Sequence, residues 1–162
     1  MRRLIGVAIL MPLLVAIPPA MATDFYGEVV GVLDGDTIEV LHDKKPERIR
    51  LYGIDCPEKG QPFGEKAKQA TSRLLFGKDV RVQKHGRDKH RSTLGTVFHG
   101  DVNMNQVLVK EGWCWWFSRY APKDSMLMQL QQEAMEAKKG LWADPNPVPP
   151  WLYRRLDAGA YP

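Results

Sequence analysis

The feature that most restricts the fold is an Asp-Gly turn between two strand-like segments. Residues 25–33 are rich in Val and Gly, and residues 37–41 alternate apolar and polar side chains. An Asp-Gly pair between such segments is a strong hairpin signal, so Asp34-Gly35-Asp36 predicts a tight turn. A polar turn over residues 42–46 then leads into a third strand, residues 47–52. The sequence therefore predicts an antiparallel meander.

The third strand leads into residues 50–58, which concentrate charged groups beside a Gly and a Pro. Alternation along this strand places Arg50 on the face opposite Ile49. Arg50 then stands just upstream of Asp55 and Glu58. Carboxylates hold hard cations and arginine binds phosphate through paired hydrogen bonds, so the group is typical of metal-assisted phosphate chemistry. For this stretch alone, an ordinary charged surface turn remains the alternative.

The meander also predicts that Asp36 lies near Asp55. The turn before the second strand and the turn after the third strand fall at the same end of three consecutive antiparallel strands. The two carboxylates are therefore expected to share one cation. Asp34 is expected to form the turn rather than to bind the metal.

The rest of the chain predicts two more strands and further helices. Strands are expected at residues 80–83 and 93–98, and helices at 65–76, 103–111 and from 124 or 125 to 139, with Gly140 as a stop. The result is an α+β, mainly β, fold: a five-stranded Greek-key barrel of the oligonucleotide-binding (OB-fold) type with about three helices. The Pro-rich tail, residues 144–162, is expected to run extended along the surface.

The N-terminus has the pattern of a secretory signal peptide. Arg2 and Arg3 precede an apolar run at residues 4–17, and Ala20-Met21-Ala22 has the small-x-small form of a cleavage site. Cleavage after Ala22 removes two positive charges and lowers the net charge from +4 to +2. The alternative is an uncleaved anchor. No later segment approaches about 18 apolar residues, so no membrane span is expected after cleavage. The sequence predicts a secreted or periplasmic protein with one domain at residues 23–143.

The densest positive charge lies in residues 84–91, Lys-His-Gly-Arg-Asp-Lys-His-Arg. A basic loop of this kind attracts phosphate backbones. A solvated surface loop is the alternative reading.

Motifs spread along most of the chain resemble one family. They are Asp34-Gly-Asp-Thr, Arg50-Leu-Tyr-Gly-Ile-Asp-Cys-Pro-Glu, Gly64-Glu-Lys-Ala, Asp88-Lys-His with Thr93-Leu-Gly, Val102-Asn, and Gly140-Leu-Trp. In order and spacing, these motifs resemble the staphylococcal nuclease (thermonuclease) family from about residue 28 to 142.

This resemblance implies a calcium-dependent phosphodiesterase that acts on DNA and RNA with little sequence preference. It implies that Asp36 and Asp55 bind Ca²⁺ together with the main-chain carbonyl of Cys56. Glu58 would activate or orient the attacking water, and Arg50 would bind the phosphate oxygens in the transition state.

One stretch departs from the family pattern. Ser92 stands where the family has a second arginine, and serine provides neither a fixed charge nor a bidentate fork. Three interpretations stay open. In the favoured one, Arg91 reaches the phosphate through a one-residue shift of the loop. Otherwise another arginine, such as Arg87, serves instead, or catalysis is weak or absent. His90 falls at an aromatic position of the family, and His90 and Tyr120 are expected to contact substrate.

The resemblance also places Cys56 beside the segment that carries Cys114. A pair of cysteines in an exported protein favours a disulfide, with two free thiols as the alternative. We expect a monomer. The competing function is an OB-fold module that binds nucleic acid or protein without useful catalysis. A two-carboxylate glycosidase explains neither the calcium turn nor Arg50.

Overall fold

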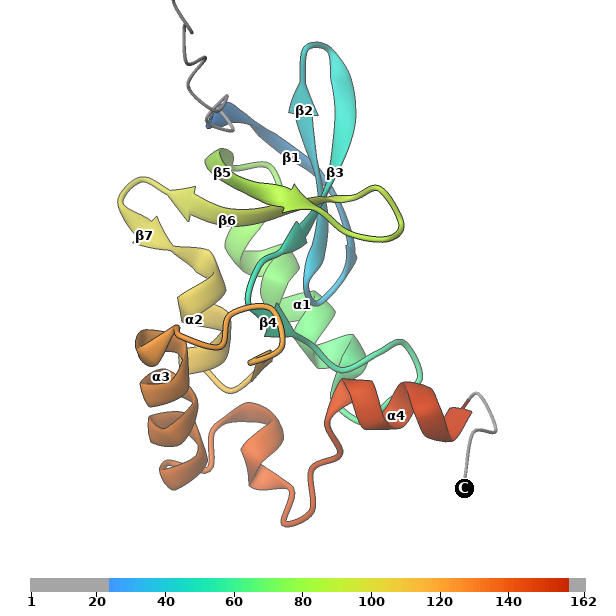
Figure 1. Ribbon diagram of the computed structural model, residues 1–162, viewed down its shortest axis with the longest axis vertical. Helices are drawn as coiled ribbons and strands as arrows, with labels where there is room; N and C mark the ends of the chain where they lie inside the picture. Colours follow the sequence, from blue (N-terminus) through green and yellow to red (C-terminus); the bar gives the residue numbers. More distant parts are fainter. Residues whose placement is uncertain (1–23, 158–162) are drawn as a thin grey trace, which may run out of the picture.

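Five strands close into a barrel in the computed structural model, which describes residues 24–157. They are β1 (Phe25–Asp34), β2 (Thr37–His42), β3 (Lys45–Leu51), β5 (Asp79–Arg87) and β6 (Thr93–His99). Neighbours in the order β3-β2-β1-β5-β6 are antiparallel, and a parallel β3–β6 pairing closes the ring (Figure 1). The predicted five-stranded barrel is confirmed. The predicted signal peptide lies outside the described residues.

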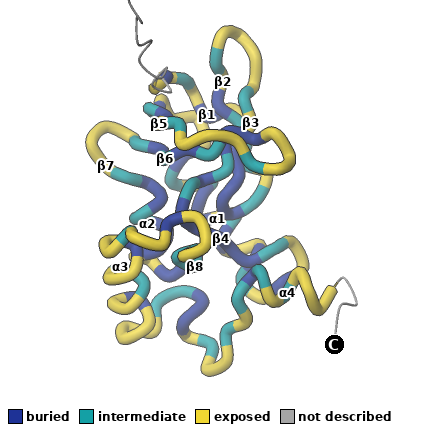
Figure 2. Tube along the Cα trace, in the orientation of Figure 1, coloured by how far each residue is buried: buried dark blue, intermediate teal, exposed yellow. Residues whose placement is uncertain are grey.

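Alternation along the strands fills the barrel. Ile49 pairs with Ile38 across β2 and β3, and both are fully buried. Val29, Val82 and Val97 from β1, β5 and β6 are equally buried, so the interior is built from branched aliphatic side chains. Figure 2 shows the buried residues gathered along the strands and the exposed residues at the loops.

One strand boundary differs from the sequence prediction, and one strand is additional. β5 runs to Arg87, so the first half of the basic segment is strand rather than loop. A register shift between Lys84 and Gly86 accommodates Gly86, which has φ 127°. A further short strand, β7 (Val102–Asn103), pairs with the end of β6.

Three helices lie where they are predicted: α1 (Gly64–Leu75), α2 (Met104–Lys110) and α3 (Ser125–Glu136). The side chains of Asn103 and Asp124 accept N-terminal backbone N–H groups of α2 and α3. α3 ends earlier than expected because Lys138 adopts a positive φ of 50°. Gly140 therefore opens a short 3-10 helix, η1 (Gly140–Ala143), instead of ending α3.

The expectation of an extended tail is wrong for residues 150–157, which form a fourth helix, α4 (Pro150–Asp157). Pro145, Pro147 and Pro149 precede this helix, and Pro150 occupies its first position. A proline there loses no helical hydrogen bond and its fixed φ favours the helix, so the Pro-rich segment ends where a helix begins. None of the helices in residues 24–157 combines the length and apolar character needed to cross a membrane.

A two-stranded pairing outside the barrel holds the stretch after β3. β4 (Ile54–Asp55) is antiparallel to β8 (Trp115–Trp116), with Asp55 opposite Trp115. The sequence did not predict this pairing, which lies in the aromatic segment at residues 113–117.

Asn105 of α2 ties the end of β3 to β6. Its Nδ2 donates to the carbonyls of Tyr52, at 2.9 Å, and Gly95, at 3.2 Å, and its Oδ1 accepts the N–H of Val97 at 3.0 Å. The side chain is almost fully buried, so these main-chain groups have little access to water if it is removed.

We predict that Asn105→Ala lowers the free energy of unfolding by about 2–3 kcal/mol, because it leaves buried main-chain groups unpaired. Urea denaturation of the mature chain measures the change. Gln132→Ala, an exposed amide on α3, is the control and should change stability by less than about 0.5 kcal/mol. Equal stability of the two variants contradicts the assigned role of Asn105.

Candidate active site

The Asp34-Gly35-Asp36 turn is pressed between α1 and the stretch after β4. A Cβ atom added to Gly35 would lie 2.7 Å from the Cβ of Cys56 and 3.0 Å from that of Ala67. The carbonyl of Gly35 accepts the buried Thr71 hydroxyl at 2.6 Å. Only glycine allows this approach without displacing the backbone, so the turn is fixed in position.

Cys56 and Cys114 form a disulfide, with 4.1 Å between their Cα atoms. The predicted pairing is therefore confirmed. The bond joins the end of β4 to the segment before β8, so it fastens the turn that carries Asp55 to the aromatic segment.

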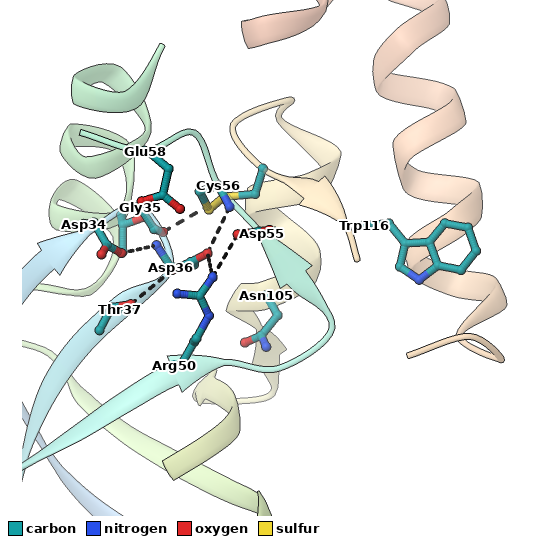
Figure 3. The surroundings of a disulfide bond; sticks show 12 residues. Asp34, Gly35, Asp36, Thr37, Arg50, Asp55, Cys56, Glu58, Asn105 and Trp116 are labelled. Atoms are coloured by element: carbon teal, nitrogen blue, oxygen red, sulfur yellow. Dashed lines mark hydrogen bonds and ion pairs between the residues drawn. A yellow bond between two sulfur atoms is a disulfide. The ribbon is translucent and has the colours of Figure 1, made fainter. Parts of the chain in front are cut away.

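Asp36 and Asp55 converge on a single guanidinium nitrogen (Figure 3). Arg50 Nη2 donates to Asp36 Oδ2 at 3.2 Å and to Asp55 Oδ1 at 2.8 Å. Both carboxylates are buried, with 3% and 1% of their residue surfaces exposed. Asp36 also accepts the Cys56 N–H at 2.9 Å and the Thr37 hydroxyl at 3.1 Å. The shared end of the meander thus brings the two acids together, as predicted.

The electrostatics of this group favour an added cation. Burial raises the pKa of Asp36 well above its ordinary value, and the nearby Asp34 and Asp55 add to the rise, while Arg50 opposes it. Burial lowers the pKa of Arg50, but Asp36 and Asp55 outweigh this effect and the net shift is upward. The charged forms of Asp36 and Arg50 therefore stabilise each other.

The donor atoms match a hard divalent cation. Among residues 24–157, no three side chains of His, Cys, Asp or Glu form a metal-binding group. An ion here would rely on Asp36 and Asp55, with its remaining positions filled by main-chain oxygen, water or phosphate. Ca²⁺ accepts such mixed sets of roughly six to eight oxygen ligands.

The flanking acids have different positions. Asp34 Oδ1 accepts the Asp36 N–H at 3.1 Å, in agreement with its expected role in the turn. Glu58 borders an open cleft of about 660 Å³ that also reaches Arg50. Its main-chain N–H is fixed by Gln61 Oε1 at 2.9 Å, so the backbone that carries this carboxylate is held in place.

The cleft brings together four of the predicted site residues and several that were not predicted. Its lining residues are Arg50, Glu58, Asp88, Lys89, His90, Phe117, Arg119, Tyr120, Trp151, Arg154 and Arg155. The main-chain oxygen of Tyr120 accepts the Tyr52 hydroxyl at 2.6 Å, which positions this aromatic edge against the end of β3.

Arg91 and Arg87 are not among the residues that line this cleft. Arg91 is exposed at a positive φ of 70°, and its carbonyl accepts Arg87 Nη1 at 3.4 Å. Ser92 is buried, with its N–H bonded to Asp88 Oδ1 at 2.8 Å. Asp88 Oδ1 also accepts the His90 N–H at 2.8 Å, so the Asp88 side chain shapes a tight turn around Ser92.

Residues 48–144 match the family model described as staphylococcal nuclease homologue. The chain belongs to this family. An uncharacterized endonuclease of Escherichia coli O157:H7 is 44% identical over 137 residues, covering 84% of this chain and 89% of the relative. A micrococcal nuclease of Shigella flexneri is 40% identical over 165 residues, covering 96% of this chain and 94% of the relative.

In this staphylococcal nuclease homologue, an arginine of the tail reaches the carboxylates, and sequence reasoning missed it. Arg154 Nη2 donates to Asp55 Oδ2 at 2.7 Å, and Arg154 Nη1 donates to Asp55 Oδ1 at 3.2 Å and to Glu58. Hydrogen bonding to Asp55 raises the pKa of Arg154. The Arg154-Arg155 pair after the prolines was visible in the sequence, but no local pattern connected it to residues near position 55.

We predict that the Cys56→Ser/Cys114→Ala double variant loses about 2–5 kcal/mol of unfolding free energy, as small domains do when a native disulfide is removed. Guanidinium denaturation measures the loss. Reduction of the wild-type protein with dithiothreitol should lower its midpoint to that of the double variant. A midpoint that neither treatment changes contradicts the clamping role of the disulfide.

Proposed function

We propose that this chain is a calcium-dependent phosphodiesterase that hydrolyses DNA and RNA with little sequence preference. The observation that carries this proposal is the convergence of buried Asp36 and Asp55 on Arg50 Nη2 beside the cleft. Membership of the staphylococcal nuclease family supports a nuclease, as do relatives described as endonuclease and micrococcal nuclease.

Asp36 and Asp55 would hold the calcium ion, with the main-chain carbonyl of Cys56 as a proposed further ligand. When bound, the ion polarises the phosphate and neutralises developing charge. Arg50 then donates hydrogen bonds to the non-bridging phosphate oxygens, and its attachment to the two carboxylates orients its guanidinium in advance. Glu58 accepts a proton from the attacking water or orients that water, from a main chain fixed by Gln61.

The cleft matches a single-stranded polynucleotide better than a small anion. Lys89, Arg119 and Arg155 place positive charge along it, and Tyr120 and Phe117 offer aromatic rings. Phosphate contacts and base stacking carry little sequence information, which accounts for the proposed broad specificity. His90 lies in the same lining and can stack or contact phosphate.

A catalytically weak binding module is the second candidate function. The observation that favours it is that neither Arg91 nor Arg87 lines the cleft and that Ser92, in the slot of the second family arginine, is buried. Such a module retains the basic cleft and its aromatic rings but does not cleave in calcium.

We predict that the mature chain cleaves single-stranded DNA and plasmid in calcium and loses this activity in chelator. Glu58→Gln should lower kcat by about 10²–10⁴, the usual contribution of a general base. Glu65→Gln, which neutralises an exposed glutamate of α1, is the matched control and should cleave like the wild type. Retained affinity for DNA without cleavage at any calcium concentration favours the binding module instead.

We propose in addition that the protein is exported to the periplasm or beyond and acts as a monomer. The leader at residues 1–22 and the disulfide both support an oxidising compartment. Cell fractionation followed by N-terminal sequencing should find a mature chain that begins at Thr23, with the elution volume of a monomer in gel filtration. A cytosolic chain that retains Met1 contradicts the proposed export.

A further inference from the structure

Arg154 joins the tail helix α4 to the turn that carries Asp55 and Glu58. Its guanidinium bonds to both oxygens of Asp55 and extends to Glu58, while Arg50 Nη2 also donates to Asp55 Oδ1. Asp55 is therefore held between two arginines that come from β3 and α4. The Arg154 side chain is 41% exposed, so it borders the cleft as well as the buried carboxylate.

Hydrogen bonds that attach the tail to the loop before α1 place Arg154 near the carboxylates. Gln61 is buried, and its Nε2 donates to the Val148 carbonyl at 2.6 Å while its Oε1 accepts the Glu58 N–H at 2.9 Å. One amide thus fixes both the main chain of Glu58 in the cleft wall and the segment that enters α4. Figure 1 shows α4 beside the loop between β4 and α1, where Gln61 lies.

Aromatic packing fixes the start of α4. The Trp151 ring lies 5.5 Å from the ring of Phe117 and 5.6 Å from that of Trp115, centre to centre. Pro150 is buried at the first helical position. Arg154 follows Trp151 by three residues and so lies on the same face of the helix, toward the carboxylates.

The local charge shows what Arg154 contributes. Asp36, Asp55 and Glu58 carry three negative charges when ionised, against the two positive charges of Arg50 and Arg154. A divalent cation on these carboxylates leaves the group with one net positive charge, which complements a phosphodiester. Without Arg154, the same loaded group is neutral.

We propose that Arg154 is a phosphate-binding catalytic residue that the tail helix supplies to the site. With a divalent cation bound at Asp55, Arg154 would exchange its carboxylate partners for the non-bridging oxygens of the substrate phosphate. Together with Arg50 it provides two planar guanidinium groups beside Asp55. The inference rests on the proposed nuclease function and assigns the tail a direct part in it.

The test compares Arg154→Ala, Arg154→Lys and Arg73→Ala in the full mature chain, by steady-state cleavage of a single-stranded DNA oligonucleotide at saturating calcium. Arg154→Ala should lower kcat by about 10²–10³, the cost of losing one preorganised donor. Arg154→Lys should recover only part of this loss, because an ammonium group cannot form the bidentate fork. Arg73→Ala removes the same charge from the exposed surface of α1, outside the cleft, and should change kcat by less than about fivefold.

A second readout does not depend on cleavage. In a Glu58→Gln background with calcium, fluorescence anisotropy measures the affinity for a labelled oligonucleotide, and adding Arg154→Ala should weaken binding at least about tenfold. Thermal unfolding checks that α4 stays docked, and Arg154→Met, which keeps the aliphatic stem, replaces the alanine variant if it does not.

The possible results separate this inference from the proposed function. A wild-type kcat or a higher one in Arg154→Ala, with unchanged DNA affinity, overturns the inference and makes Arg154 a competitor of the cation. If the wild-type chain cleaves nothing, the proposed function fails. The anisotropy comparison then still decides whether Arg154 binds the phosphate backbone.

Discussion

The structure depends on the burial of two carboxylates around one arginine nitrogen. Asp36 and Asp55 are both almost inaccessible to water, and isolated buried charges of this kind are strongly unfavourable. Arg50 compensates for part of this cost from the polar face of β3. The site therefore requires three backbone segments, which carry Asp36, Arg50 and Asp55, to stay in place. Each segment carries a charge whose burial is unfavourable.

Several features outside the barrel strands meet that requirement. Gly35 allows the first turn to lie against Cys56 and α1, and Thr71 holds its carbonyl. The disulfide and the β4–β8 pairing fix the second turn. Asn105 binds the end of β3 to β6, just upstream of the same turn. Each of these contacts joins residues distant in sequence, so the rigidity of the site comes from tertiary structure.

The barrel and the acidic pair could be predicted because their signals are local. Alternation and the Asp-Gly turn define the strands, and strand direction alone places Asp36 near Asp55. The β4–β8 pairing could not be predicted, because strands of two residues have no period. The family resemblance placed Cys56 beside Cys114. It also supplied the roles proposed for Arg50 and Glu58, which residue spacing alone does not determine.

The tail shows the opposite case. Its prolines predicted an extended chain, yet Pro150 starts a helix that carries Arg154 to Asp55, 99 residues away in sequence. A contact at that separation leaves no trace in local composition. The turn around Ser92 was equally unpredictable, since it depends on the Asp88 carboxylate, which accepts the N–H groups of both His90 and Ser92.

Calcium calorimetry tests the central claim most directly. Titration of the mature chain at neutral pH should give about one calcium ion bound per molecule, and Asp55→Asn should abolish the binding heat while the protein stays folded. Equal calcium binding by the wild type and by Asp55→Asn would show that the two buried carboxylates do not form the cation site, and would contradict the account.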